Sequence, residues 1–204
     1  MLGLLFLVIF AVYLLVSFGV IHFGIKQARK RGFKGWLGGL LAAFVMYSLV
    51  FWDLIPVYLI HDYQCENNAG FTVYKTLDEW KQENLGVAEI LIPIENSSPK
   101  KMGKTTRYQL NQRFAWDITY SKIWHIVRKV DERIIDIETG YVLVQYIDFS
   151  ASVSGLYNAN KLSDYKLWFE AGSCEQANSL RTRPQKYRFN KLKSWIKYQY
   201  HKGI

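Results

Sequence analysis

Only a few side chains in this sequence have the type and spacing that acid–base chemistry requires. His61 and Asp62 are neighbours, and Asp53 precedes them in the chain. Acting on a lipid-linked substrate, these three would provide an acid and a base at a membrane surface. Motifs for a nucleophile elbow, a Walker phosphate loop, a dinucleotide-binding loop and an HExxH zinc site are absent from the sequence. We therefore predict no catalytic residue, no metal ligand and no cofactor, and keep a membrane-surface enzyme as the alternative.

A cluster of acidic residues is interleaved with cations in the middle of the chain. Its members are Asp131, Glu132, Asp136 and Glu138, with Arg128, Lys129 and Arg133 among them. Carboxylates gathered in this way can bind a divalent cation. On paired strands, however, opposite charges that face each other form ion pairs. We therefore expect ion pairs here rather than a metal site.

The chain contains two cysteines, Cys65 and Cys174, and no CxxC motif. Two cysteines are too few to form a zinc site by themselves. In an oxidising compartment we expect a disulfide between them. It would close a loop of about 110 residues and stabilise the fold by about 4–5 kcal/mol in the chain-entropy model. Two buried free thiols are the alternative.

The compartment depends on a basic stretch without any acid, KQARKRGFK at 26–34, whose cations are Lys26, Arg29, Lys30, Arg31 and Lys34. An uncharged run at 1–21 precedes it, long enough to cross roughly 30 Å of hydrocarbon as a helix. A second apolar run follows at 36–60. We predict a transmembrane hairpin over 1–60, with spans at about 2–22 and 36–58 and a cytoplasmic turn at 26–34.

A cleaved signal peptide is the alternative for the first apolar run. It would need a positively charged start, a shorter apolar core and a cleavage site between small residues. The first residues carry no Lys or Arg, and the apolar run continues past Ser17 and Gly19. We therefore expect the first helix to be retained, with its N-terminus outside the cytoplasm.

Polar and small residues interrupt the second apolar run. Asp53 lies about 20 residues beyond the basic turn, roughly 30 Å along a helix, which places Trp52 and Asp53 at the far membrane interface. Pro56 predicts a kink or a helix end there. The small residues at 38–39 and 42–43 either form a face that packs on the first helix or are simply common in membrane helices.

Residues 61–204 have the composition of an α+β domain built on an antiparallel sheet. Thr76 and Glu79 have capping-box spacing, which predicts a short helix at about 77–84. Alternating apolar residues on both sides of Glu138-Thr139-Gly140 predict a β-hairpin. The alternation of Phe71–Lys75 predicts a short strand, and four or five antiparallel strands are expected from Arg107 onward. Residues 87–94 are expected to be extended, 95–104 a loop and 158–171 either a helix or a strand. With the basic turn inside, this domain and the N-terminus are expected in the periplasm of a Gram-negative cell, anchored in the inner membrane.

A basic helix is predicted at the C-terminal end, where residues 181–202 hold eight cations and no acid. Phe189, Leu192, Trp195, Ile196 and Gln199 share one face of it. Such a helix either lies on a membrane surface or packs on the sheet with its lysines in solvent. The candidate lipid or partner contacts are Arg188, Lys191, Lys193, Trp195 and Lys197, and in a membrane-tethered protein anionic headgroups are a nearer partner than nucleic acid.

The junction after the second apolar run carries a recognisable pattern. Trp52-Asp53-x-Ile55-Pro56 is followed by Cys65-x4-Gly70-x3-Tyr74-Lys75-Thr76. This pattern resembles that of uncharacterised small proteobacterial membrane proteins with two N-terminal spans and an exported domain. The resemblance covers residues 50–85 and implies the architecture, and no activity or site comes with it.

These observations favour a binding role over catalysis. We expect a membrane-anchored periplasmic binding or accessory protein of an envelope complex, or a protective factor of the immunity or exclusion type. Its expected partners are membrane lipids and a protein of the envelope, and no nucleic acid. An enzyme acting on lipid-linked envelope substrates is the alternative.

Overall fold

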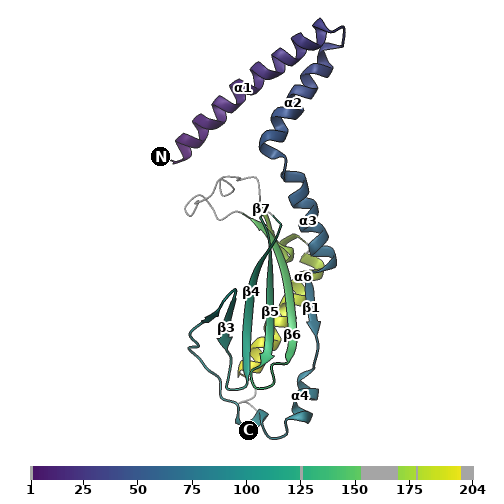
Figure 1. Cartoon of the computed structure of the whole chain (residues 1–204). Coiled ribbons are helices and arrows are strands. Elements are labelled where there is room, and N and C mark those ends of the chain that lie inside the picture. The colour runs from purple at the N-terminus through teal and green to yellow at the C-terminus, as the bar shows by residue number, and fades with distance from the viewer. Residues whose placement is uncertain (1, 125, 153–169, 178, 199–204) are drawn as a thin grey trace. The chain divides into compact units, whose positions relative to one another are not determined.

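The computed structural model describes residues 2–124, 126–152, 170–177 and 179–198 (Figure 1). The chain divides into two compact units, Met1–Pro56 and Val57–Ile204. The first unit is helical, and the second contains a β-sheet with helices. The expected boundary at residue 60 lies a few residues beyond this division.

The first unit contains α1 (Leu2–Lys30), α2 (Gly35–Phe51) and the start of α3 (Leu54–Asn67). Among the described helices, α1 alone is long and apolar enough in one piece to cross a membrane, over Leu7–Lys30. The helix therefore ends eight residues later than predicted, because Lys and Arg are good helix formers and favourable near a helix C-terminus. Three of the five cations thus lie on α1 itself, and only Arg31 and Lys34 lie in the turn.

The predicted second span at 36–58 is not one continuous helix. The chain breaks at Trp52 and Asp53, between α2 and α3, so the structure shows one clear candidate span and a second only if the broken pair counts as one. Pro56 explains the break. It has no N–H to offer the carbonyl of Trp52, and its ring clashes with that carbonyl in a continuous helix.

Small residues bring α1 and α2 into close contact, as one of the two interpretations of the sequence expected. A Cβ atom added at Gly24 would lie 2.7 Å from the Gly38 carbonyl oxygen and 2.8 Å from the Ala42 Cβ. Farther from the turn, Tyr13 Oη donates a hydrogen bond to the Met46 carbonyl at 2.8 Å. The two backbones approach this closely only because glycine has no side chain.

The second unit is built on an antiparallel sheet in the order β1-β6-β5-β4-β3-β2, with β7 also paired to β6. The strands are β1 (Gly70–Val73), β2 (Lys100–Met102), β3 (Thr105–Gln109), β4 (Phe114–Trp124), β5 (Val127–Asp136), β6 (Val142–Ser152) and β7 (Glu170–Ser173). The predicted hairpin is confirmed as β5–β6, with Gly140 at φ 73° in its turn. Among the described residues this sheet has seven strands, more than predicted, because β2 and β7 are too short to show a pattern.

The segment between β1 and β3 differs in part from expectation. The predicted capping box is confirmed at the start of α4 (Leu77–Glu83), where the Glu79 N–H donates to Thr76 Oγ1 at 3.3 Å. Residues 87–94, predicted as extended, contain the 3₁₀ helix η1 (Ala88–Ile90). The predicted loop at 95–104 contains β2. Most of 158–171 lies outside the described residues, and Glu170 and Ala171 belong to β7.

Two helices follow β7, the short α5 (Cys174–Ala177) and the long α6 (Ser179–Tyr198). The apolar face of α6 packs on one face of the sheet, and Phe189 and Ile196 are fully buried there. The core that they share includes Trp80, Phe114, Ile134, Leu143 and Tyr146. Packing on the sheet is therefore the observed arrangement of this helix, whereas Gln199 lies outside the described residues.

The acidic cluster is divided between the two faces of the sheet, because successive side chains on a strand point to opposite faces. On the face opposite α6, Asp131 accepts hydrogen bonds from Arg133 at 2.8 Å and from Gln145 at 2.7 Å. On the α6 face, Glu132 forms an ion pair with Lys186 and accepts a hydrogen bond from Trp116. Ion pairs are thus confirmed for this cluster. Asp136 and Glu138 likewise pair with Arg113.

Candidate functional site

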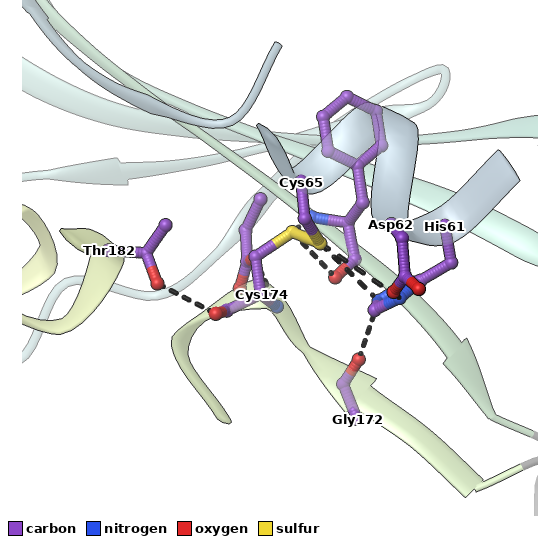
Figure 2. Close-up of polar contacts among 8 residues, drawn as sticks. His61, Asp62, Cys65, Gly172, Cys174 and Thr182 are labelled. Carbon is purple, nitrogen blue, oxygen red and sulfur yellow. Dashed lines mark hydrogen bonds and ion pairs between the residues drawn. A yellow bond between two sulfur atoms is a disulfide. The ribbon is translucent and has the colours of Figure 1, made fainter. Parts of the chain in front are cut away.

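A disulfide joins the end of α3 to α5, as the sequence predicts for an oxidising compartment. The Sγ atoms of Cys65 and Cys174 are 1.99 Å apart, the Cα atoms are 5.3 Å apart, and both residues are buried. Figure 2 shows this bridge with His61 on one side and Thr182 on the other. Thr182 Oγ1 donates a hydrogen bond to the Cys174 carbonyl at 2.7 Å, which fixes α6 to the bridge.

His61 lies against the disulfide and is only 1% exposed. Its Nε2 atom is 3.1 Å from the Gly172 carbonyl oxygen, and its Nδ1 atom is 3.4 Å from Asp62 Oδ1 (Figure 2). The imidazole therefore connects α3 to β7. At 1% exposure, the ring is not accessible to a substrate from solvent. Asp53, the third residue of the alternative catalytic set, belongs to the first unit, at the break after α2.

His61, Cys65 and Cys174 resemble a metal-binding group, since their ligand atoms lie within 4.8 Å of one another. A cysteine binds a metal as its thiolate. Both sulfur atoms are joined to each other here, so neither is available as a thiolate. The arrangement is that of a buried disulfide with a histidine packed beside it.

Asp148 supports the same region from β6. Its Oδ1 atom accepts hydrogen bonds from the N–H of Cys174 at 3.0 Å and the N–H of Phe149 at 2.9 Å. Burial raises the pKa of Asp148, and these two hydrogen bonds offset only part of that increase. The carboxyl group holds the start of α5 in place.

An open groove of about 890 Å³ lies elsewhere in the second unit, between β1, the start of α4, and α6. Six of the residues that line it are Phe71, Val73, Lys75, Arg188, Leu192 and Trp195. Apolar side chains provide most of its surface. Arg188 and the neighbouring Lys191 are exposed at its rim.

The five candidate contact residues on α6 divide between two sides of the helix. Arg188, Lys191 and Trp195 line the groove. Lys193 and Lys197 line a smaller pocket of about 310 Å³. The Lys193 ammonium lies 3.6 Å from the centre of the Trp116 ring, and burial lowers its pKa. Lys193 is therefore held between helix and sheet rather than in solvent.

The edge of the sheet forms one wall of the groove. β1 is the terminal strand of the sheet and pairs only with β6 among the described strands. On its outer side, the Phe71 N–H donates to Gln185 Oε1 of α6 at 3.2 Å. The sequence predicted this strand from its alternation, but its position at an edge beside α6 depends on the order of strands, which alternation does not reveal.

Comparisons with known proteins do not add a function to this geometry. No family model matches the chain, and neither a curated protein nor a solved structure matches it. The groove at the β1 edge is therefore the candidate site on which the function is argued.

Proposed function

We propose that this protein is a membrane-anchored binding protein of the bacterial envelope, either an accessory subunit or a protective factor of the immunity type. The groove between β1 and α6 carries this proposal. It combines an apolar floor with a cationic rim, and protein-binding surfaces commonly have an apolar, aromatic centre within a polar rim. Non-catalytic binding fits better than catalysis because His61, the best-placed base in the sequence, is buried against the disulfide.

The membrane anchor and its orientation are part of the proposal. α1 would cross the inner membrane with its cationic end in the cytoplasm, because short loops rich in Lys and Arg remain on that side. The broken pair of α2 and the first turn of α3 would form the return crossing, since α2 alone is about 26 Å long. The second unit would then lie in the periplasm, where the Cys65–Cys174 disulfide persists.

Photo-crosslinking in intact cells tests this function. A photoreactive amino acid is placed at Val73 or Lys191 in the groove, and at Lys101 on β2 as a matched exposed control. We expect one discrete protein adduct from the two groove positions and none from the control. Adducts with lipid alone, or equal labelling at all three positions, would contradict a protein-binding role for the groove.

A further inference from the structure

We propose that the groove binds an extended, acidic segment of a partner protein, which pairs with the outer edge of β1 as an additional strand of the sheet. This inference rests on the proposed function and names the kind of partner and its mode of binding. Strand addition uses main-chain hydrogen bonds for affinity and pockets for alternate side chains for specificity. The outer edge of β1 provides the main-chain groups, and the floor and the rim of the groove provide the contacts for side chains.

The strands at the two ends of the order, β1 and β2, differ in how they are protected. β2 is three residues long, all three are exposed, and it carries Lys100 and Lys101. Charged side chains, lysine above all, are a common way to prevent another chain from pairing with an edge. β1 has the sequence Gly-Phe-Thr-Val and no charge. Of these two strands, β1 is the one suited to pairing.

The backbone of β1 is oriented for this pairing. In an antiparallel ladder, successive residues direct their backbone groups alternately toward the partner strand and away from it. The Tyr74 N–H donates to the Leu143 carbonyl of β6 at 2.8 Å, so Val73 and Phe71 direct theirs outward. The Phe71 N–H donates to the Gln185 side chain, whose amide oxygen stands where the carbonyl of an added strand would begin.

The floor of the groove receives alternate side chains of the added strand. The side chains of Phe71 and Val73 lie on the α6 side of the sheet, and Val73 is 45% exposed. Leu192 and Trp195 face them from α6. A segment that matches the four residues of β1 would be roughly 14 Å long, with every second side chain on this apolar floor.

The charge of the rim selects an acidic segment. Arg188 and Lys191 are exposed on α6, and the Arg188 guanidinium lies 5.9 Å from the centre of the Phe71 ring. Lys75 is paired with Glu83 at 2.7 Å, and Asp78 is an acidic residue on the same groove. The lining therefore remains cationic overall. Carboxylates on the α6 side of the added strand, at positions that flank the side chains on the apolar floor, would lie within reach of Arg188 and Lys191.

The probe is a library of random eight-residue peptides, selected against the full chain in detergent. We expect enrichment of peptides that combine β-branched or aromatic residues with Asp or Glu two positions before or after them, because residues two apart share a face of the strand. The double variant Arg188→Glu/Lys191→Glu should weaken the enriched peptides about tenfold. The matched variant Lys100→Glu/Lys101→Glu on β2 should leave their affinity unchanged.

Hydrogen exchange distinguishes strand addition from side-chain contact alone. A bound strand accepts a hydrogen bond from the Val73 N–H, so amide exchange at Val73 should slow about tenfold in the peptide complex. Binding without slower exchange at Val73, or enrichment of neutral or basic peptides or of none, would overturn the inference. If a protein still crosslinks at Val73 and Lys191 in cells, the proposed function survives that result. If acidic peptides bind with slower exchange at Val73 but no protein crosslinks in cells, strand addition is supported and the proposed function is contradicted.

Discussion

Asp131 is a buried carboxylate on the face of the sheet opposite α6, surrounded by side chains from β5 and β6. Burial alone would raise its pKa, but hydrogen bonds from Arg133 and Gln145 outweigh burial, so the pKa lies below its ordinary value. Gln145 in turn accepts a hydrogen bond from Tyr74 Oη at 2.6 Å. A single carboxylate thus links β5 and β6 to Tyr74, the residue that follows β1.

Replacing Asp131 with Asn should destabilise the second unit in a manner that depends on pH. At pH 7 we expect a loss of about 2 kcal/mol, since hydrogen bonds to a charged group are strong. A depressed pKa stabilises the fold above the unfolded pKa of about 3.9, and this stabilisation disappears as the pH falls through the folded pKa. Urea unfolding in detergent at pH 7 and pH 3, followed by tryptophan fluorescence, measures both values.

The matched control for this variant is Asp78→Asn, because Asp78 is exposed. It should change the free energy of unfolding by less than about 0.5 kcal/mol at either pH. An Asp131→Asn variant that loses the same free energy at pH 3 as at pH 7 would show that its charge does not provide the stabilisation.

In the first unit, the packing of α1 against α2 depends on a close approach of their backbones at Gly24 and Gly38. A Cβ atom at Gly38 would overlap the Gly24 carbonyl oxygen and the Ala28 Cβ. Larger side chains there can be accommodated only if α1 and α2 separate. Gly19 lies on the same helix as Gly24, yet nothing lies within 4 Å of a Cβ added to it. Gly38 and Gly19 therefore provide a matched pair of sites, one in the helix contact and one outside it.

Gly38→Leu should push α1 and α2 apart, whereas Gly19→Leu should not. Spin labels attached to cysteines introduced at Val16 and Phe44, both exposed, would report the separation by pulsed electron paramagnetic resonance. We expect a longer and broader distance distribution in the Gly38 variant, because overlap with backbone atoms cannot be relieved by a rotamer change. The same distribution in both variants would mean that the glycine contact does not hold the hairpin together.

Elements with a sequence pattern of their own over a few residues were predictable. Strands that exist only because they pair with another strand, and have no such pattern, were not. The capping box of α4 and the β5–β6 hairpin each use residues a few positions apart. β2 is a three-residue strand of Lys-Lys-Met that exists because Thr105–Gln109 lies beside it. Its sequence has low strand propensity, so no local pattern marked it. η1 shows the converse, since a β-branched run beside Pro93 did not form a strand.

At the scale of the whole molecule, the proposed topology connects the anchor to the disulfide. The basic stretch at 26–34 would stay in the cytoplasm, and the second unit would be exported. The Cys65–Cys174 disulfide joins residues 109 positions apart, and an exported domain can keep it because the periplasm is oxidising. The same link would be reduced in the cytosol.

A reporter fusion tests this topology. Alkaline phosphatase, which folds only in an oxidising compartment, should be active in cells when fused after Ile204. Replacing all five cations of 26–34 with Gln should lower that activity several-fold, because the charge bias that orients the hairpin is removed. Strong activity of a cytosolic reporter at the same position would contradict the orientation and, with it, the proposed envelope function.

The sequence by itself determined the features that follow from local chemistry. These are an uncharged N-terminal helix with a cationic end, a helix break shortly before Pro56, a capped helix after Thr76, a hairpin around Gly140 and an amphipathic helix near the C-terminus. Each depends on solvent preference, backbone geometry or hydrogen bonding within a few residues. The cysteine pair belongs with them, since only one pairing within the chain is available.

Only the tertiary structure decided which strand lies at an edge and what lies beside it. Phe71 and Val73 look like any alternating strand in the sequence, and Arg188 and Lys191 look like any solvated helix face. They form one groove because β1 pairs with β6 on one side and α6 crosses near the other. Contacts between residues more than 100 positions apart depend on strand order and packing of the whole domain, which no short stretch of sequence encodes.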